Sequence, residues 1–251
     1  MKTFLIVMAI VAVVVFVALF FIDAGYGKFY TKRWGPAINN RIGWVLMEAP
    51  VFVLMAILYS KSTVANMPLF IAFFALFQLH YLHRSFVFPF LLRGNGRMPL
   101  AVILMAVIFN TLNAVMQGGY LFYTQADNAM YDASWFASPQ FIIGTIIFFL
   151  GMGINHHSDA VIRALRQPGD SRHYLPNKGL YRYVTSANYL GEIVEWCGFA
   201  LLTWSLSGAV FALWTFANLA PRAARIYKSY QAEFPEQLQA HPRRRLIPYI
   251  W

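Results

Sequence analysis

The chain has 251 residues, of which 59% are apolar and 12% are charged. A soluble domain carries about 25% charged residues, so this composition excludes an ordinary water-soluble globule. The single cysteine, Cys197, excludes an intrachain disulfide framework. A net charge of +10 also occurs in nucleic-acid-binding proteins, but on so apolar a chain it is more typical of membrane topology. We therefore predict a polytopic integral membrane protein that contacts membrane lipids and no nucleic acid.

Several segments are long and apolar enough to cross a hydrocarbon core, which takes about 20 residues per helix. The first follows Lys2 and is too long for a typical signal peptide, so we expect it to stay as a helix. The sequence thus predicts an all-α, single-domain protein over 1–251, monomeric and with seven transmembrane helices. The predicted spans are 3–22, 42–59, 68–88, 99–123, 139–156, 186–205 and 208–228.

The basic residues predict the orientation of these spans. If the N-terminus lies outside, 18 of the 20 Lys and Arg residues fall on the inside, and only Lys2 and Lys61 fall outside. We therefore expect an outside N-terminus and a cytosolic C-terminus, in the inner membrane of a bacterium or the endoplasmic reticulum of a eukaryote. The inside segments 23–41, 89–98 and 157–185 and the tail 229–251 are expected to close over a cofactor.

Ionisable side chains within spans are costly, so they indicate functional positions. Glu48 lies in the second span and is followed by Pro50, which opens the helix backbone, although a capping role for the carboxylate is an alternative. In the third span, helical spacing places Tyr81 and Arg84 on one face. The neighbouring His80 is expected to point elsewhere.

The fifth span runs into a polar stripe at helical spacing. Gly151 and Gly153 precede the stripe and are expected to let a helix or a ligand approach closely. His156 and His157 suggest a metal, but adjacent residues on a helix point apart, so we expect no metal site. The stripe comprises Asn155, Asp159, Arg163 and Arg166.

The sixth span begins with Asn188, Glu192 and Glu195 on one face, which need donors opposite them. The inside end of the seventh span supplies candidate donors, namely Arg222, Arg225, Tyr227 and Tyr230. A weaker stripe in the fourth span is equally consistent with a cavity lining or with interhelical hydrogen bonds; it comprises Asn110, Asn113 and Gln117.

These polar residues share one property: almost all lie near the inside ends of their helices. This arrangement predicts one polar site open to the cytosol, with an apolar chamber beneath it. Carboxylates, amides and several arginines suit a phosphorylated cofactor. The chain has no Gly-x-Gly-x-x-Gly after a strand and no Gly-Lys-Ser/Thr loop, so a Rossmann or P-loop site is excluded.

At these residues the chain resembles the steroid 5α-reductase (3-oxo-5α-steroid 4-dehydrogenase) family, as a bacterial-type or divergent member. The resemblance runs from Gly25 to Trp251, and the first helix matches only as an anchor. It rests on Trp44-x-x-x-Glu48-x-Pro50, Leu79-His80-Tyr81-x-His83-Arg84, Leu150-Gly-Met-Gly-Ile-Asn155-x-His157-Ser158-Asp159, Ala187-Asn188-x-Leu-Gly-Glu192-x-x-Glu195-Trp196 and Leu246-Ile-Pro248-Tyr249-Ile250.

The resemblance implies NADPH-dependent reduction of the C4–C5 double bond of 3-oxo-Δ4-steroids, with Glu48 and Tyr81 bonded to the 3-keto oxygen. The position before Glu48 is Met47, where steroid-active relatives have glutamine, and Ala223–Ile226 replaces a histidine-rich stretch. Substrate-cavity residues are expected to be Trp44, Met47, Asn113 and Gln117. Implied cofactor residues are Lys28, Arg97 (or Arg93), Asn155, Asp159, Arg166, Asn188, Glu192, Arg222 and Tyr230.

Three alternatives remain at this point. The nearest is reduction of another lipid enone or enoyl group, such as an enoyl thioester, a polyprenoid or a sterol. A membrane methyltransferase fits less well, because the reductase motifs match better. A transporter predicts an inverted repeat and helices broken at the midplane, and the sequence shows no such repeat.

Overall fold

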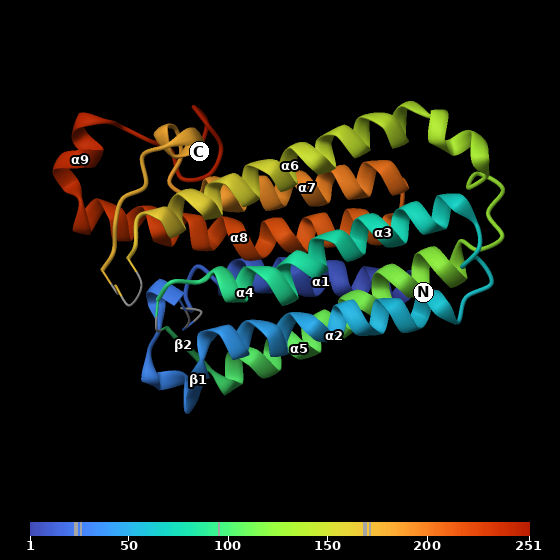
Figure 1. Cartoon of the computed structure of the whole chain (residues 1–251), viewed down its shortest axis with the longest axis horizontal. Coiled ribbons are helices and arrows are strands. Elements are labelled where there is room, and N and C mark those ends of the chain that lie inside the picture. The colour runs from blue at the N-terminus through green and yellow to red at the C-terminus, as the bar shows by residue number, and fades with distance from the viewer. Residues whose placement is uncertain (23–24, 26, 95, 168–169, 171) are drawn as a thin grey trace.

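The computed structural model describes residues 1–22, 25, 27–94, 96–167, 170 and 172–251. Long helices run side by side along the longest axis of the molecule (Figure 1). In the described part of the chain, helical segments lie at all seven predicted positions. They are α1 (Lys2–Ala18), α2 (Asn40–Ser60), α3 (Pro68–Leu82), α5 (Leu100–Gly119), α6 (Pro139–Ala164), α7 (Ala187–Thr203) and α8 (Leu206–Glu233).

Several boundaries differ from the prediction. Helix α6 continues to Ala164 instead of ending at 156, so the polar stripe belongs to the same helix as the apolar span. Helix α3 continues through a π-helical turn, His83–Val87, into the short α4 (Phe88–Leu91). A second π turn, Tyr120–Thr124, extends α5. The short α9 (Pro235–Ala240) follows α8, and 3₁₀ turns occur at Gly27–Phe29, Lys32–Trp34, Ala133–Ala137 and Gly179–Arg182.

The all-α prediction misses one small sheet. Strands β1 (Ala37–Asn39) and β2 (Arg97–Pro99) pair antiparallel, with Ala37 opposite Pro99. They form because α2 and α5 pack side by side and each begins directly after one of these strands. The packing therefore brings the two strands together at one end of the bundle (Figure 1).

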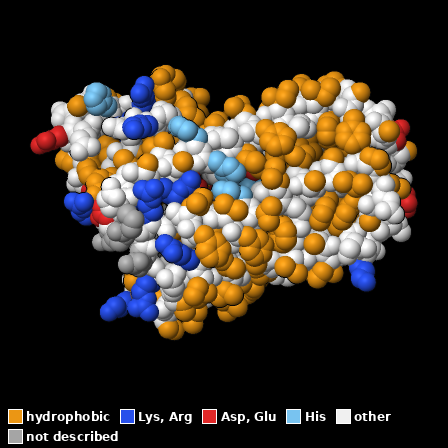
Figure 2. Space-filling model, in the orientation of Figure 1, with side chains coloured by type: hydrophobic (Ala, Val, Ile, Leu, Met, Phe, Trp, Pro, Cys, Tyr) orange, Lys and Arg blue, Asp and Glu red, His pale blue; other side chains and the backbone are white. Residues whose placement is uncertain are grey.

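The outer surface is suited to lipid. Within the described residues, three helices are long and apolar enough to cross a membrane, Asn40–Ser60, Leu100–Thr124 and Pro139–Ala164, and α1 is a shorter apolar helix. Large aliphatic side chains are exposed along α1, α2, α5 and α6. Figure 2 shows hydrophobic side chains over much of the bundle, whereas most Lys and Arg side chains gather at the end that carries β1, β2 and α9. An exposed apolar belt with a basic end is typical of a membrane protein.

Helices α6 and α7 share the most extensive helix–helix packing. A Cβ added at Gly151 would lie 2.2 Å from the backbone nitrogen of Glu195, and one at Gly191 would lie 2.4 Å from that of Asn155. The two backbones are therefore in contact at these glycines. Gly153 was also predicted to allow a close approach, but it faces open space instead. The close approach places Asn188 of α7 against Asn155 and Asp159 of the polar stripe of α6.

Candidate active site

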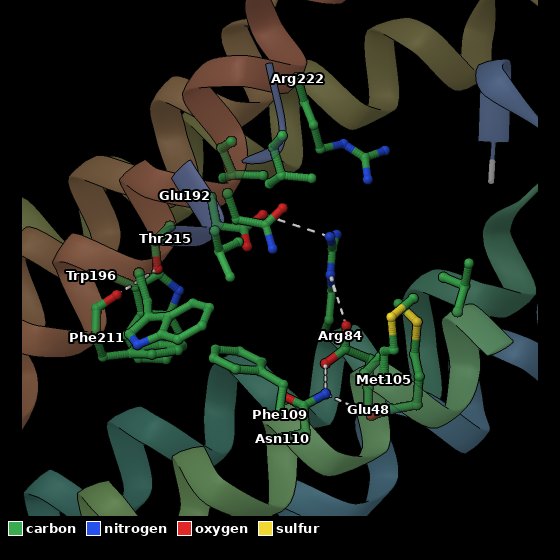
Figure 3. Close-up of a pocket in the computed structure, with 18 of the residues that line it drawn as sticks. Glu48, Arg84, Met105, Phe109, Asn110, Glu192, Trp196, Phe211, Thr215 and Arg222 are labelled. Carbon is green, nitrogen blue, oxygen red and sulfur yellow. Dashed lines mark hydrogen bonds and ion pairs between the residues drawn. The ribbon is translucent and has the colours of Figure 1, made fainter. Parts of the chain in front are cut away.

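A cavity of about 470 Å³ lies among α1, α2, α3, α5, α7 and α8 (Figure 3). Its walls are mostly apolar or aromatic, including Trp44, Met47, Phe109 and Trp214. This volume falls within the roughly 300–1,000 Å³ typical of pockets for drug-sized ligands. The polar side chains that line it are Glu48, His80, Tyr81, Arg84, Asn110, Glu192, Thr215, Asn218 and Arg222.

Glu48 is buried on α2 and points into this cavity. The Asn110 side chain donates from Nδ2 to Glu48 Oε2 at 3.0 Å and also to the Met47 carbonyl. Pro50, in the next turn, lacks a backbone N–H and so interrupts the helical hydrogen bonds of this region. Asn110 therefore holds one oxygen of Glu48 and leaves the other facing Arg84 and the cavity, as Figure 3 shows.

Tyr81 is buried in α3 next to the same cavity, with its ring against Phe77 and Trp196. Asn113 donates from Nδ2 to the Tyr81 hydroxyl oxygen at 2.9 Å. Because Asn113 is the donor in this bond, the hydroxyl proton of Tyr81 is left for another acceptor.

Arg84 occupies the centre of the site, a position that sequence reasoning did not assign to it. Its guanidinium lies 3.6 Å from Glu192 Oε2, and 4.0 Å from both Glu48 and Asp159. It also lies over the ring of Trp44, 4.5 Å from the centroid. One cation thus links carboxylates from α2, α6 and α7. The signal in the sequence was an arginine inside a predicted span, one turn from Tyr81.

His80 and Tyr81 point in different directions, as expected, and yet both line the cavity. They reach it from opposite sides, because His80 leans toward α7, where its Nδ1 lies 2.8 Å from Glu195 Oε1, and Tyr81 leans toward Asn113 on α5. The His80–Glu195 pair also escaped sequence reasoning. Nothing local in the chain predicts a contact between residues 115 positions apart.

A second, smaller pocket of about 150 Å³ lies nearer the basic end. Four of the residues that the resemblance implies for cofactor binding line this pocket, namely Lys28, Arg166, Asn188 and Tyr230. Burial lowers the pKa of Lys28, and its hydrogen bond and ion pair with Glu233, 3.0 Å away, oppose that shift. Burial raises the pKa of Tyr230 to about 12, so this phenol stays a hydrogen-bond donor at neutral pH.

The two pockets follow each other along the same two helices. On α7, Asn188 lines the small pocket and Glu192, one turn on, lines the large one. On α8, Arg222 lines the large pocket, while Ile226 and Tyr230 line the small one. Residues four apart share a helix face about 6 Å apart along the axis. The two pockets are therefore neighbours along α7 and α8.

Asn155 and Asp159 of α6 form hydrogen bonds with Asn188, which lines the small pocket. Asn155 donates from Nδ2 to the Asn188 carbonyl at 2.9 Å, and Asn188 donates from its own Nδ2 to Asp159 at 3.1 Å. Both α6 residues are buried. They orient Asn188, the residue that lines the small pocket.

Besides Asn155 and Asp159, three further predicted site residues line neither pocket. Arg97 donates to the Ala37 carbonyl across the small sheet, whereas Arg93 of the same loop donates to the Arg166 carbonyl at 3.0 Å. Asn113 donates to the Tyr81 hydroxyl and is itself outside both pocket linings. Gln117 donates to the Ser207 carbonyl at 2.9 Å, which is the interhelical alternative for this stripe.

Within the residues that the structure describes, no cluster of three or more His, Cys, Asp and Glu side chains has the arrangement of a metal site. His83 and His156 stack with ring centroids 3.8 Å apart. His157, the next residue of the helix, points elsewhere and packs near Gly179.

Fold and site together define a membrane-type helical protein with an apolar chamber next to a smaller polar pocket. Residues 96–251 match the family model described as 3-oxo-5-alpha-steroid 4-dehydrogenase. The chain is 39% identical over 232 residues to the 3-oxo-5-alpha-steroid 4-dehydrogenase 1 of Macaca fascicularis, covering 91% of this chain and 86% of that protein. It is 39% identical over 232 residues to the 3-oxo-5-alpha-steroid 4-dehydrogenase 2 of Homo sapiens, covering 91% and 88%.

The human 3-oxo-5-alpha-steroid 4-dehydrogenase 1 is 38% identical over 229 residues, which cover 90% of this chain and 86% of that protein. The chain therefore belongs to the 3-oxo-5-alpha-steroid 4-dehydrogenase family, a family of oxidoreductases.

Proposed function

We propose that the protein is an NADPH-dependent reductase of the C4–C5 double bond of 3-oxo-Δ4-steroids. The observation that carries this proposal is the pairing of Glu48 and Tyr81 at one apolar cavity, each held by an asparagine of α5. Family membership supports the same reaction, since the relatives carry that activity in their names.

For the membrane arrangement, we propose seven crossings with the N-terminus outside and the C-terminus in the cytosol. The seven helical segments and the basic end of the molecule support this topology. In this orientation the small pocket lies on the cytosolic side, where segments 27–41 and 172–185 and the tail approach it, and a soluble cofactor has access.

For the substrate, a flat fused-ring lipid suits the large cavity. Its walls include Val15, Leu19 and Ile22 from α1 and the residues after it, and Met105 from α5, all apolar. The Glu48 carboxyl of α2 and the Tyr81 phenol of α3 both line this cavity. A steroid bound with its ketone at these two groups buries its hydrocarbon rings against the remaining apolar side chains.

The chemistry of an enone explains why the site needs both the Glu48 carboxyl and the Tyr81 hydroxyl. The β-carbon accepts a hydride readily only when donors stabilise the negative charge that develops on the carbonyl oxygen. The Tyr81 hydroxyl has its proton free because Asn113 is the donor in their hydrogen bond. Glu48 donates only when it carries its proton, a state that burial in low dielectric favours. Arg84 keeps the surrounding carboxylates in place.

The donor set of the small pocket fits a phosphorylated dinucleotide. Lys28 and Arg166 supply positive charge, Tyr230 supplies a hydroxyl, and Asn188 supplies an amide. When bound, such a cofactor supplies the hydride. Glu192 and Arg222 would hold the part of it that reaches the large cavity.

We predict a preference for NADPH over NADH that depends on Arg166. Replacing Arg166 by alanine removes a guanidinium from the small pocket, and a charged hydrogen bond is worth about 1.5–3 kcal/mol. The expected result is a KM for NADPH raised about tenfold or more, with kcat nearly unchanged. The exposed Arg182 provides the control, since Arg182→Ala should leave KM unchanged. Equal use of NADH and NADPH by the natural protein would contradict a phosphate-binding role.

Product analysis tests the proposed substrate class. Purified protein with NADPH is offered a 3-oxo-Δ4-steroid, an enoyl thioester, a polyprenoid and a sterol in separate reactions. We expect a saturated 3-oxo-5α-steroid as the main product. Reduction of another lipid in the panel, with the steroid untouched, would assign the site to that lipid.

A further inference from the structure

His80 and Glu195 form a buried pair beside the reacting groups, and the mechanism above does not use it. His80 Nδ1 lies 2.8 Å from Glu195 Oε1, and the Glu195 side chain is 1% exposed. A buried carboxylate is costly unless it is paired and hydrogen-bonded. The pair connects α3 to α7 at the point where α7 contacts α6 through Gly151.

The pair is oriented toward the cavity. His80 lines the cavity, and its ring is fixed edge-to-face against Trp196, with centroids 4.6 Å apart, and against Tyr81, at 4.9 Å. Glu195 engages Nδ1, so Nε2 is the nitrogen available to a molecule in the cavity. A carboxylate on one nitrogen and a free second nitrogen is the arrangement of a histidine that transfers protons.

The charges that face His80 suit a cation there. Glu192 and Glu195 on α7 act on it as negative charges, and Arg84 opposes them. Glu48 on α2 also faces His80, but it is uncharged when it carries the proton that it donates to the substrate. The phenol of Tyr81 lies beside His80. The two carboxylates of α7 against one guanidinium leave one negative charge, which an imidazolium balances.

Reduction of an enone requires a proton as well as a hydride. The hydride goes to the β-carbon and leaves an enolate, whose oxygen engages Glu48 and Tyr81. The α-carbon then needs a proton from a different direction, because both of these groups are occupied at the oxygen. His80, next to Tyr81 in the cavity wall, is a titratable donor on this side of the site.

We propose that His80, held by Glu195, delivers the proton to the α-carbon of the substrate, an assignment that rests on the proposed function. The enolate π electrons form the new bond between the α-carbon and the proton of Nε2. The electrons of the broken N–H bond stay on the imidazole, and Nδ1 keeps its proton and its bond to Glu195. The enolate becomes a ketone, and solvent returns one proton to His80 for the next turnover.

The test uses proton exchange, which needs no reductant. A group that delivers a proton to the α-carbon also removes it, so the full-length protein in D₂O should exchange the C4 hydrogens of a saturated 3-oxo-5α-steroid. We expect His80→Gln to lower this exchange at least about a hundredfold, in line with general acid–base catalysis. Glu195→Gln should lower it less, because His80 remains. Exchange is measured by mass spectrometry and NMR.

Two controls separate a chemical role from a structural one. Stabilisation by NADPH against thermal unfolding should persist in His80→Gln and in the double variant His80→Gln/Glu195→Gln, which keeps a neutral hydrogen-bonded pair. His241, exposed after α9, serves as matched control, and His241→Gln should exchange normally.

The outcomes distinguish this proposal from the proposed function. Suppose that the natural protein reduces the steroid and that His80→Gln exchanges the C4 hydrogens as fast as the natural protein. The proton role of His80 is then overturned, and the proposed reductase function is retained. No exchange by the natural protein overturns the proton role as well. If the natural protein reduces no 3-oxo-Δ4-steroid at all, the proposed function and the role of His80 fall together.

Discussion

Replacing Glu48 by glutamine should lower kcat for steroid reduction at least about a hundredfold, and replacing Tyr81 by phenylalanine should do the same. Tyr81→Phe removes a donor to the developing oxyanion, and Glu48→Gln replaces an acidic O–H donor by an amide N–H that is far less acidic. The loss of one such donor typically costs about 10²–10³ in rate. Both changes are nearly isosteric. In Glu48→Gln, the oxygen of the new amide can still accept from Asn110, which holds Glu48 in the natural protein.

Cofactor binding should be unaffected by either change, because Glu48 and Tyr81 line only the large cavity. The measurement is single-turnover oxidation of NADPH with a saturating steroid, together with thermal stabilisation by NADPH alone. Glu236→Gln, on the exposed α9, is the matched control and should behave like the natural protein. Steroid reduction at the natural rate by both site variants would remove these residues from the mechanism.

Gly151→Ala should destabilise the protein far more than a methyl added on the open side of α6. The new Cβ would lie 2.2 Å from the Glu195 nitrogen and 2.7 Å from the Gly191 carbonyl oxygen, and backbone atoms cannot rotate away. Overpacking of this kind costs about 1–3 kcal/mol or more. We expect the Tm in detergent to fall by roughly 5 °C or more. Steroid turnover should fall too, because α7 would shift and carry Glu192 and Glu195 with it.

Gly153→Ala is the matched control in the same helix, since nothing lies within 4 Å of its added Cβ. Alanine also favours the helix over glycine by about 1 kcal/mol, so its Tm should stay the same or rise. Equal Tm values for the two variants would show that the backbones of α6 and α7 do not touch at Gly151.

Hydropathy and helical spacing were enough to predict the helical segments and several residues of the candidate site. Apolar runs of about 20 residues have few structural solutions, so the positions of the long helices followed from composition. Ionisable residues such as Glu48 and Glu192 were informative because lipid opposes them. Their clustering near one end of the helices predicted a shared site, and the structure brings both to one cavity.

Contacts between distant segments could not be predicted in the same way. The pairing of His80 with Glu195 depends on how α3 and α7 pack, which no local pattern encodes. Helical spacing placed Arg84 on the same face as Tyr81, but its ion pairs with carboxylates of α2, α6 and α7 depend on how these helices pack. The family resemblance assigned Arg97 to the cofactor, but Arg97 donates to the Ala37 carbonyl across the β1–β2 sheet.

The most direct test of the account follows a labelled hydride. Purified protein in lipid nanodiscs is given a 3-oxo-Δ4-steroid and NADPH that carries deuterium at the transferable position of the nicotinamide. The account predicts one deuterium at C5 of a saturated 3-oxo-5α-steroid for each NADPH oxidised, and almost none with Glu48→Gln. Unreduced steroid, or a saturated product without deuterium at C5, would contradict it.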